Sequence, residues 1–141
     1  MTDLRSELEA WCRSYVDAFE RYDANAIAAH WTFPALTTQA GRSFAFQSEE
    51  HFAKNTSRLL GFYQAQHVER VHREVDDILI MGPNAVSMTV SDQMMDAAGA
   101  GIASWQAAYV LQRVDGGWKA VAAVADGEVD AWAARGTPLG G

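Results

Sequence analysis

Asp92 places a carboxylate in an otherwise apolar row. Its strand neighbours on the same face, read at every second position, are Val86, Met88, Val90 and Met94. Burying an unpaired carboxylate is costly and raises its pKa. A carboxyl group in an apolar pocket can move protons or, when neutral, donate a hydrogen bond. We therefore interpret Asp92 as a candidate catalytic acid or base. The alternative is a strand that frays before its turn and leaves Asp92 in water.

Gln106 is expected to lie across from Asp92. The small-residue turn at 97–101 pairs two predicted strands, and Asp92 and Gln106 are equally far from Gly99 at its centre. An amide beside a carboxyl group can fix its orientation or bind a ligand carbonyl. The alternative for Gln106 is an ordinary cross-strand hydrogen bond.

His30 lies in an aromatic segment that ends a short alanine-rich helix. A histidine there can titrate near neutral pH and reach the mouth of a cavity, although the helix dipole also favours histidine in a last turn. Trp31 and Phe33 follow it, and we expect them to form a hydrophobic plug between helix and sheet. Pro34 is predicted to end the helix.

Other chemical motifs are weak. His67 and His72 lie on opposite faces of a predicted strand, so they do not converge on a metal ion. Cys12 is the single cysteine, which excludes a site of several thiolates. The glycines around Gly99 lie between strands rather than before a helix, unlike a nucleotide-binding loop. We expect neither a metal nor a cofactor.

Composition indicates one globular domain. The chain has 141 residues, 49% of them hydrophobic, and we place the domain at residues 1–134 and a flexible tail at 135–141. The net charge of −7, without a run of Lys or Arg, argues against nucleic acids and anionic membranes as partners. The charged first residues and the single cysteine predict a cytoplasmic protein.

The first half of the chain reads as helices. Apolar residues three and four apart predict a helix over 4–22, and Asp23 caps a short second helix over 24–31. Two short strands are predicted at 35–41 and 42–46. Ser48 then begins a third helix that runs to Gln66.

The second half reads as four long strands, at 68–81, 85–96, 102–114 and 118–125, followed by a short helix at 127–134. Asp115-Gly116 is a hairpin signal. This order predicts an α+β fold, with three N-terminal helices packed on a curved, mainly antiparallel sheet. The last two strands are apolar on both faces, which predicts a homodimer through the sheet.

The stretch YVDAFERYDANAIAAHW, at 15–31, combines a long helix, an Asp-capped turn and a short helix that ends in an aromatic residue. With the element order over residues 3–126, it resembles the nuclear transport factor 2-like (NTF2-like) superfamily, and most of all its SnoaL-like and ketosteroid-isomerase-like members. The resemblance implies a cone-shaped fold and a pocket for a small apolar ligand. Family members are often dimers, and some are isomerases, cyclases, dehydratases or epoxide hydrolases.

The resemblance also implies a role for Tyr15, because a tyrosine at a comparable helix position donates the oxyanion hydrogen bond in ketosteroid isomerases. The alternative is that Tyr15 is a core residue. One departure is clear. Those isomerases carry a catalytic aspartate on the strand after the second helix, and residues 36–39 here contain no carboxylate.

Our hypothesis is a dimeric small-molecule-binding protein, with cofactor-independent isomerase, cyclase or dehydratase activity on an apolar cyclic substrate. Asp92 is the expected acid or base, and Tyr15 or His30 the oxyanion donor. The expected ligand contacts are Trp31, Phe33, Met88, Met94 and Gln106. The alternative is a non-catalytic module that binds a ligand or a partner.

Overall fold

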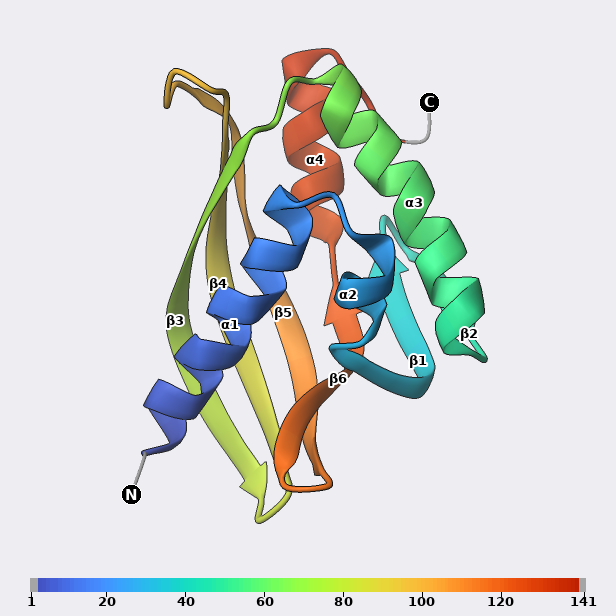
Figure 1. Cartoon of the computed structure of the whole chain (residues 1–141), viewed down its shortest axis with the longest axis vertical. Coiled ribbons are helices and arrows are strands. Elements are labelled where there is room, and N and C mark those ends of the chain that lie inside the picture. The colour runs from blue at the N-terminus through green and yellow to red at the C-terminus, as the bar shows by residue number, and fades with distance from the viewer. Residues whose placement is uncertain (1–2, 140–141) are drawn as a thin grey trace.

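The computed structural model describes residues 3–139 and shows one curved sheet with helices on its concave face (Figure 1). The six strands are ordered β2-β1-β6-β5-β4-β3. Only the β1–β6 pair is parallel, so the sheet is mixed. The strands are β1 (Trp31–Gln39), β2 (Arg42–Phe46), β3 (Arg70–Gly82), β4 (Ala85–Met95), β5 (Gly101–Val114) and β6 (Gly117–Val124).

The helices are α1 (Leu4–Glu20), α2 (Ala24–Ala28), α3 (Glu49–Ala65) and α4 (Asp126–Arg135). The predicted α+β class is confirmed. The helix arrangement differs from the prediction, because only α1 and α2 precede the first strand. Helix α3 follows the β1–β2 hairpin, and α4 returns across the sheet after the last strand (Figure 1).

Side-chain caps set the starts of three helices. Asp3 accepts a hydrogen bond from the Ser6 amide at 2.7 Å, and the caps of α2 and α3 act in the same way. Asp23 accepts from the Ala26 amide at 3.0 Å. These oxygens satisfy amides that have no partner within the helix. The caps predicted at Asp23 and Ser48 are confirmed.

The segment around Pro34 differs from the prediction. Helix α2 ends at Ala28, and Pro34 lies inside β1 rather than after a helix. Strand β1 pairs with β6 at Trp31 and again from Leu36, with an irregularity between them. Proline has no amide hydrogen to give to a ladder, so the interruption falls where Pro34 stands.

The strand faces follow the predicted alternation. Every second residue of β4, from Val86 through Asp92 to Met94, is buried on the concave face. At the β5–β6 hairpin, Asp115 and Gly116 have φ of 51° and 81°, as expected for a tight turn in which both residues are left-handed.

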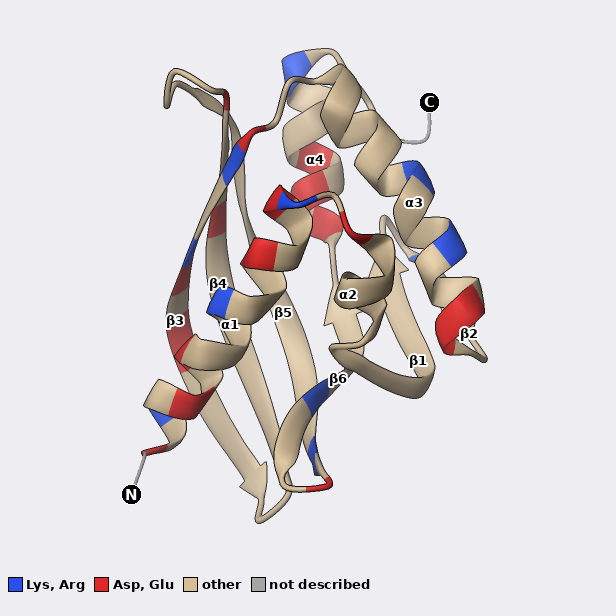
Figure 2. Cartoon of the chain, viewed as in Figure 1, with Lys and Arg blue, Asp and Glu red and all other residues tan. Residues whose placement is uncertain are grey.

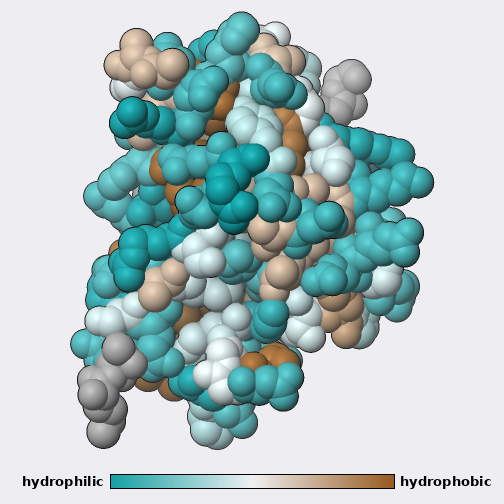
Figure 3. All heavy atoms as spheres, viewed as in Figure 1, coloured by the Kyte–Doolittle hydropathy of each residue, from teal (hydrophilic) through white to brown (hydrophobic). Residues whose placement is uncertain are grey.

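The surface seen from the direction of Figure 1 is mainly hydrophilic, with small, separated apolar areas (Figure 3). Acidic residues are spread over α1, β3, α3 and α4 rather than gathered in one patch (Figure 2). Within residues 3–139, no helix is both long enough and apolar enough to cross a membrane.

Candidate active site

A cavity of about 850 Å³ lies between the helices and the concave face of the sheet. All four helices and several strands contribute to its wall. Most of the wall is aromatic or aliphatic, including Phe19, Ile27, Trp31, Phe46, Phe52 and Trp105. Seven ionisable or phenolic side chains from α1, α3, α4 and the sheet interrupt this apolar wall: Tyr15, Arg58, Tyr63, Arg73, Asp92, Tyr109 and Glu128. A cavity of this size and lining suits a small, mainly apolar molecule.

Asp92 and Arg73 form a buried ion pair at the cavity wall. Arg73 Nε and Nη2 donate to the two Asp92 carboxylate oxygens at 2.6 and 2.8 Å, and their side chains are only 6% and 3% exposed. Burial opposes the charge on Arg73, but Tyr109 and Asp92 outweigh it, and the pKa of Arg73 is raised. Both Asp92 oxygens are therefore held by a fixed cation.

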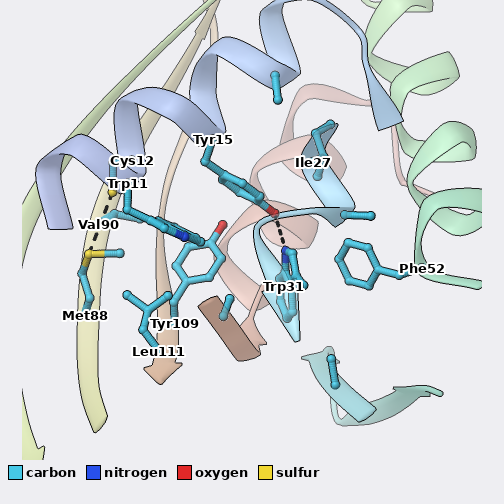
Figure 4. Close-up of a cluster of buried hydrophobic side chains, with 14 of the residues drawn as sticks. Trp11, Cys12, Tyr15, Ile27, Trp31, Phe52, Met88, Val90, Tyr109 and Leu111 are labelled. Carbon is cyan, nitrogen blue, oxygen red and sulfur yellow. Dashed lines mark hydrogen bonds between the residues drawn. The ribbon is translucent and has the colours of Figure 1, made fainter. Parts of the chain in front are cut away.

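The phenol rings of Tyr15 and Tyr109 pack edge to face, with ring centroids 6.0 Å apart (Figure 4). Trp31 Nε1 donates to the Tyr15 hydroxyl at 3.0 Å, and Arg73 Nη2 donates to the Tyr109 hydroxyl at 2.9 Å. Since each phenol oxygen accepts a hydrogen bond, its own hydrogen is available for a ligand. Burial raises the pKa of both groups, to about 12 for Tyr109. Both phenols therefore stay protonated near neutral pH.

Glu128 comes to the same cavity from the first turns of α4. One of its oxygens, Oε2, accepts hydrogen bonds from the Tyr63 hydroxyl and from Trp132 Nε1, the latter at 3.2 Å. Burial raises the pKa of Glu128 to about 7, and the Asp92 charge adds to the rise. The two hydrogen bonds and Arg73 act in the opposite direction. A carboxyl group with a pKa in this range is suited to acid–base catalysis at neutral pH.

The family of NTF2-like proteins designated DUF6841 matches residues 6–128 of the chain. The chain belongs to this NTF2-like family. No curated protein matches its sequence.

Solved structures share the fold. Aln2 from a Streptomyces species superposes with a TM-score of 0.70 at 15% identity, over 88% of this chain and 90% of that one. A ketosteroid isomerase-like protein from Erwinia carotovora atroseptica gives 0.64 at 18% identity, over 88% and 95%. A domain of unknown function with a cystatin-like fold, from Nostoc punctiforme, gives 0.67 at 18% identity, over 87% and 77%. At these identities the likeness shows the fold alone.

Half of the site residues expected from the sequence line the cavity of this NTF2-like protein. They are Tyr15, Trp31, Asp92 and Met94. His30 lies outside the lining, where its ring nitrogens meet the Ala26 carbonyl at 2.7 Å and the Ser14 hydroxyl at 2.8 Å. Burial lowers the pKa of His30.

Phe33 and Met88 also lie outside the lining. Phe33 packs edge-on against Phe52, with ring centroids 5.7 Å apart. Met88 is fully buried, with its sulfur 3.9 Å from that of Cys12 beneath α1 (Figure 4).

The expected pairing of Gln106 with Asp92 is wrong by one residue. Trp105 lies opposite Asp92, and Gln106 pairs with Ser91 on the other face, where it is exposed. An irregularity at Met94 and Met95 shifts the register next to the turn. A shift of one residue moves a side chain to the opposite face of a sheet.

The sequence prediction missed Arg73, Tyr109, Tyr63 and Glu128. Strand β1 contributes Trp31, Thr37 and Gln39 to the cavity lining, so the wall there carries no carboxylate. Pro138 and Leu139, from the segment predicted to be a flexible tail, also line the cavity. Residues 140–141 of that segment lie outside the described residues.

Proposed function

We propose that this NTF2-like protein binds a small, mainly apolar molecule in its cavity and transfers a proton on it without a cofactor. The observation that carries the proposal is Glu128, a carboxyl group with a pKa of about 7 in the wall of an apolar cavity. A base works best when its pKa lies near the working pH, because it can then both take up and release a proton.

The chemistry follows from the groups around Glu128. Its carboxylate would remove a proton from a carbon next to a carbonyl group. The phenol of Tyr15 or Tyr109 would then donate a hydrogen bond to the oxygen on which negative charge develops. Isomerases, cyclases and dehydratases that act on carbonyl compounds share this first step. The aromatic lining suits an apolar cyclic substrate.

In this proposal the proton moves through Glu128 and not through Asp92. Both Asp92 oxygens already accept N–H groups of Arg73. Arg73 in turn donates to the Tyr109 hydroxyl. Asp92 therefore supports the site indirectly, because it holds the guanidinium that orients one phenol.

Deuterium exchange into a simple cyclic ketone tests the proposal. The protein is incubated with β-tetralone in D₂O, and the loss of the proton signal next to the carbonyl is followed by NMR. We expect the wild type to accelerate exchange and Glu128→Gln to lose about 10²- to 10⁴-fold of that acceleration, the usual contribution of a general base. The control Glu50→Gln removes an exposed carboxylate at the start of α3 and should keep the wild-type rate.

The alternative function is ligand binding without catalysis. The absence of a carboxylate where β1 lines the cavity, at Trp31, Thr37 and Gln39, favours it. Mass spectrometry of the denatured, purified protein would identify a molecule carried in the cavity. If the wild type binds β-tetralone and leaves its exchange rate at the buffer value, the catalytic proposal fails and the binding function is favoured.

We also propose a homodimer through the convex face of the sheet. Val110 and Leu36 both lie beside Ala122 on the face opposite the buried side chains, and Leu36 is 40% exposed. Light scattering of the purified protein tests this. We expect a dimer mass for the wild type, a monomer mass for Val110→Asp, and a dimer mass for the control Gln64→Asp on exposed α3. A wild-type monomer would contradict the proposal.

A further inference from the structure

Gly127 lies at the start of α4, directly before Glu128, and its backbone meets the backbone of β5 without space for a side chain. A Cβ atom added to Gly127 would lie 2.5 Å from the carbonyl oxygen of Gln106. It would also lie 3.4 Å from the Gln106 nitrogen and from Trp105 Cβ. A backbone carbonyl in the middle of a sheet cannot swing aside as a flexible side chain can.

A second contact fixes the same turn from the other side. The Ala125 amide donates to the carbonyl oxygen of Thr38 in β1 at 2.8 Å. The first turn of α4 is thus held against β1 through Ala125 and against β5 through Gly127. Glu128 follows immediately, and its Oε2 atom lies within hydrogen-bond reach of Tyr63 and Trp132.

We propose that Gly127 is a positioning residue for Glu128. Its missing side chain lets α4 approach β5 closely enough to place the half-buried Glu128 carboxyl group in the cavity wall, within hydrogen-bond reach of Tyr63 and Trp132. Ordinary contact begins at about 3.4 Å, so any larger residue would move the start of α4 outward by roughly 1 Å. The carboxyl group would then be more exposed to water, and the burial that raises its pKa to about 7 would be reduced. The catalytic role of Glu128 comes from the proposed function, whereas the positioning of its carboxyl group by Gly127 does not depend on that function.

The test is a titration of the Glu128 carboxyl carbon by NMR in protein labelled with ¹³C-glutamate, with Glu128→Gln used to assign the signal. We expect Gly127→Ala to lower the midpoint from about 7 toward the ordinary value of 4.5. The matched control is Gly61→Ala in α3, where an added Cβ meets nothing within 4 Å, and it should leave the midpoint unchanged.

A second control separates positioning from loss of stability. Val86→Ala weakens the buried core outside the cavity lining and should also leave the midpoint unchanged. An unchanged midpoint in Gly127→Ala, or an equal fall in Val86→Ala, would overturn the inference.

Should Gly127→Ala fail to fold, the wild type supplies the test. The close approach predicts a strong nuclear Overhauser effect between a Gly127 Hα and the Gln106 amide hydrogen, and its absence would overturn the inference. All these measurements are made without a ligand. A protein that fails to exchange β-tetralone yet shows the expected titrations would refute the proposed function and leave the role of Gly127 standing.

Discussion

The pH dependence of stability follows directly from the environment of Glu128, and replacing Glu128 by glutamine reveals it. The folded-state pKa is raised from 4.5 to about 7. A carboxyl group with a raised pKa stabilises the fold fully below its unfolded-state value, where it is neutral in both states. That contribution is lost as the pH rises through the folded-state value, because the folded protein must then hold a charge that burial disfavours.

The size of the effect can be worked out. The difference between 4.5 and about 7 corresponds to about 3 kcal/mol, at ~1.4 kcal/mol for each pH unit. This value is an upper limit, because water in the cavity would solvate part of the Glu128 charge. Glutamine has nearly the same shape and can accept the hydrogen bonds of Tyr63 and Trp132, but it does not titrate.

Urea unfolding of both proteins between pH 4 and pH 9 measures the effect. We expect similar unfolding free energies near pH 4, and a wild type that becomes less stable than Glu128→Gln by up to about 3 kcal/mol above pH 7. Glu50→Gln supplies the background for removal of an exposed carboxylate. Parallel curves for wild type and Glu128→Gln over the whole range would refute the raised pKa.

Three further outcomes are expected. Asp92→Asn leaves the buried guanidinium of Arg73 without its counter-ion. Urea unfolding should therefore show a free energy of unfolding that is lower by about 3–5 kcal/mol. An unchanged free energy of unfolding would refute the ion pair. Tyr63→Phe removes a hydrogen bond that lowers the Glu128 pKa, so the NMR titration midpoint should move above 7, and a fall would contradict that contact. Tyr15→Phe removes one oxyanion donor and should slow ketone exchange by about 10²- to 10³-fold. It also leaves the buried Trp31 Nε1 group without its acceptor, so stability should fall by about 1–3 kcal/mol. An unchanged exchange rate would exclude Tyr15 from the chemistry.

Local chemistry made much of the fold predictable. Asp23 and Ser48 were predictable as helix caps, because their side-chain oxygens can accept a hydrogen bond from an amide in the first turn. Asp115-Gly116 was predictable as a tight turn, because both residues tolerate a left-handed backbone. The prediction that Pro34 ends the second helix was wrong, because proline is found after helices and also at irregularities in strands. The sheet is mainly antiparallel, as predicted. Its parallel β1–β6 pair was not identified, because that pair joins segments far apart in the chain.

The candidate site was predictable only in part. Asp92 was detectable because a carboxylate in an apolar row signals an unusual environment. Its partner Arg73 was not, because β-bulges in the β3–β4 pair shift the register between the turn and Asp92. Glu128 was not predicted, because α4 is too short for its sequence periodicity to show which side chains face the cavity. Its neighbour Gly127, a glycine in the first turn of that helix, is the one sequence feature that indicates a close backbone approach.

The most direct test of the central claim is the ¹³C titration of Glu128 in the wild-type protein, with and without 2-naphthol as a phenol probe for the cavity. The account predicts a midpoint near 7 in the free protein and a shift of that midpoint when the probe is bound. A midpoint near 4.5, or one that bound probe does not change, would contradict the claim that Glu128 is the proton-transfer group of the cavity.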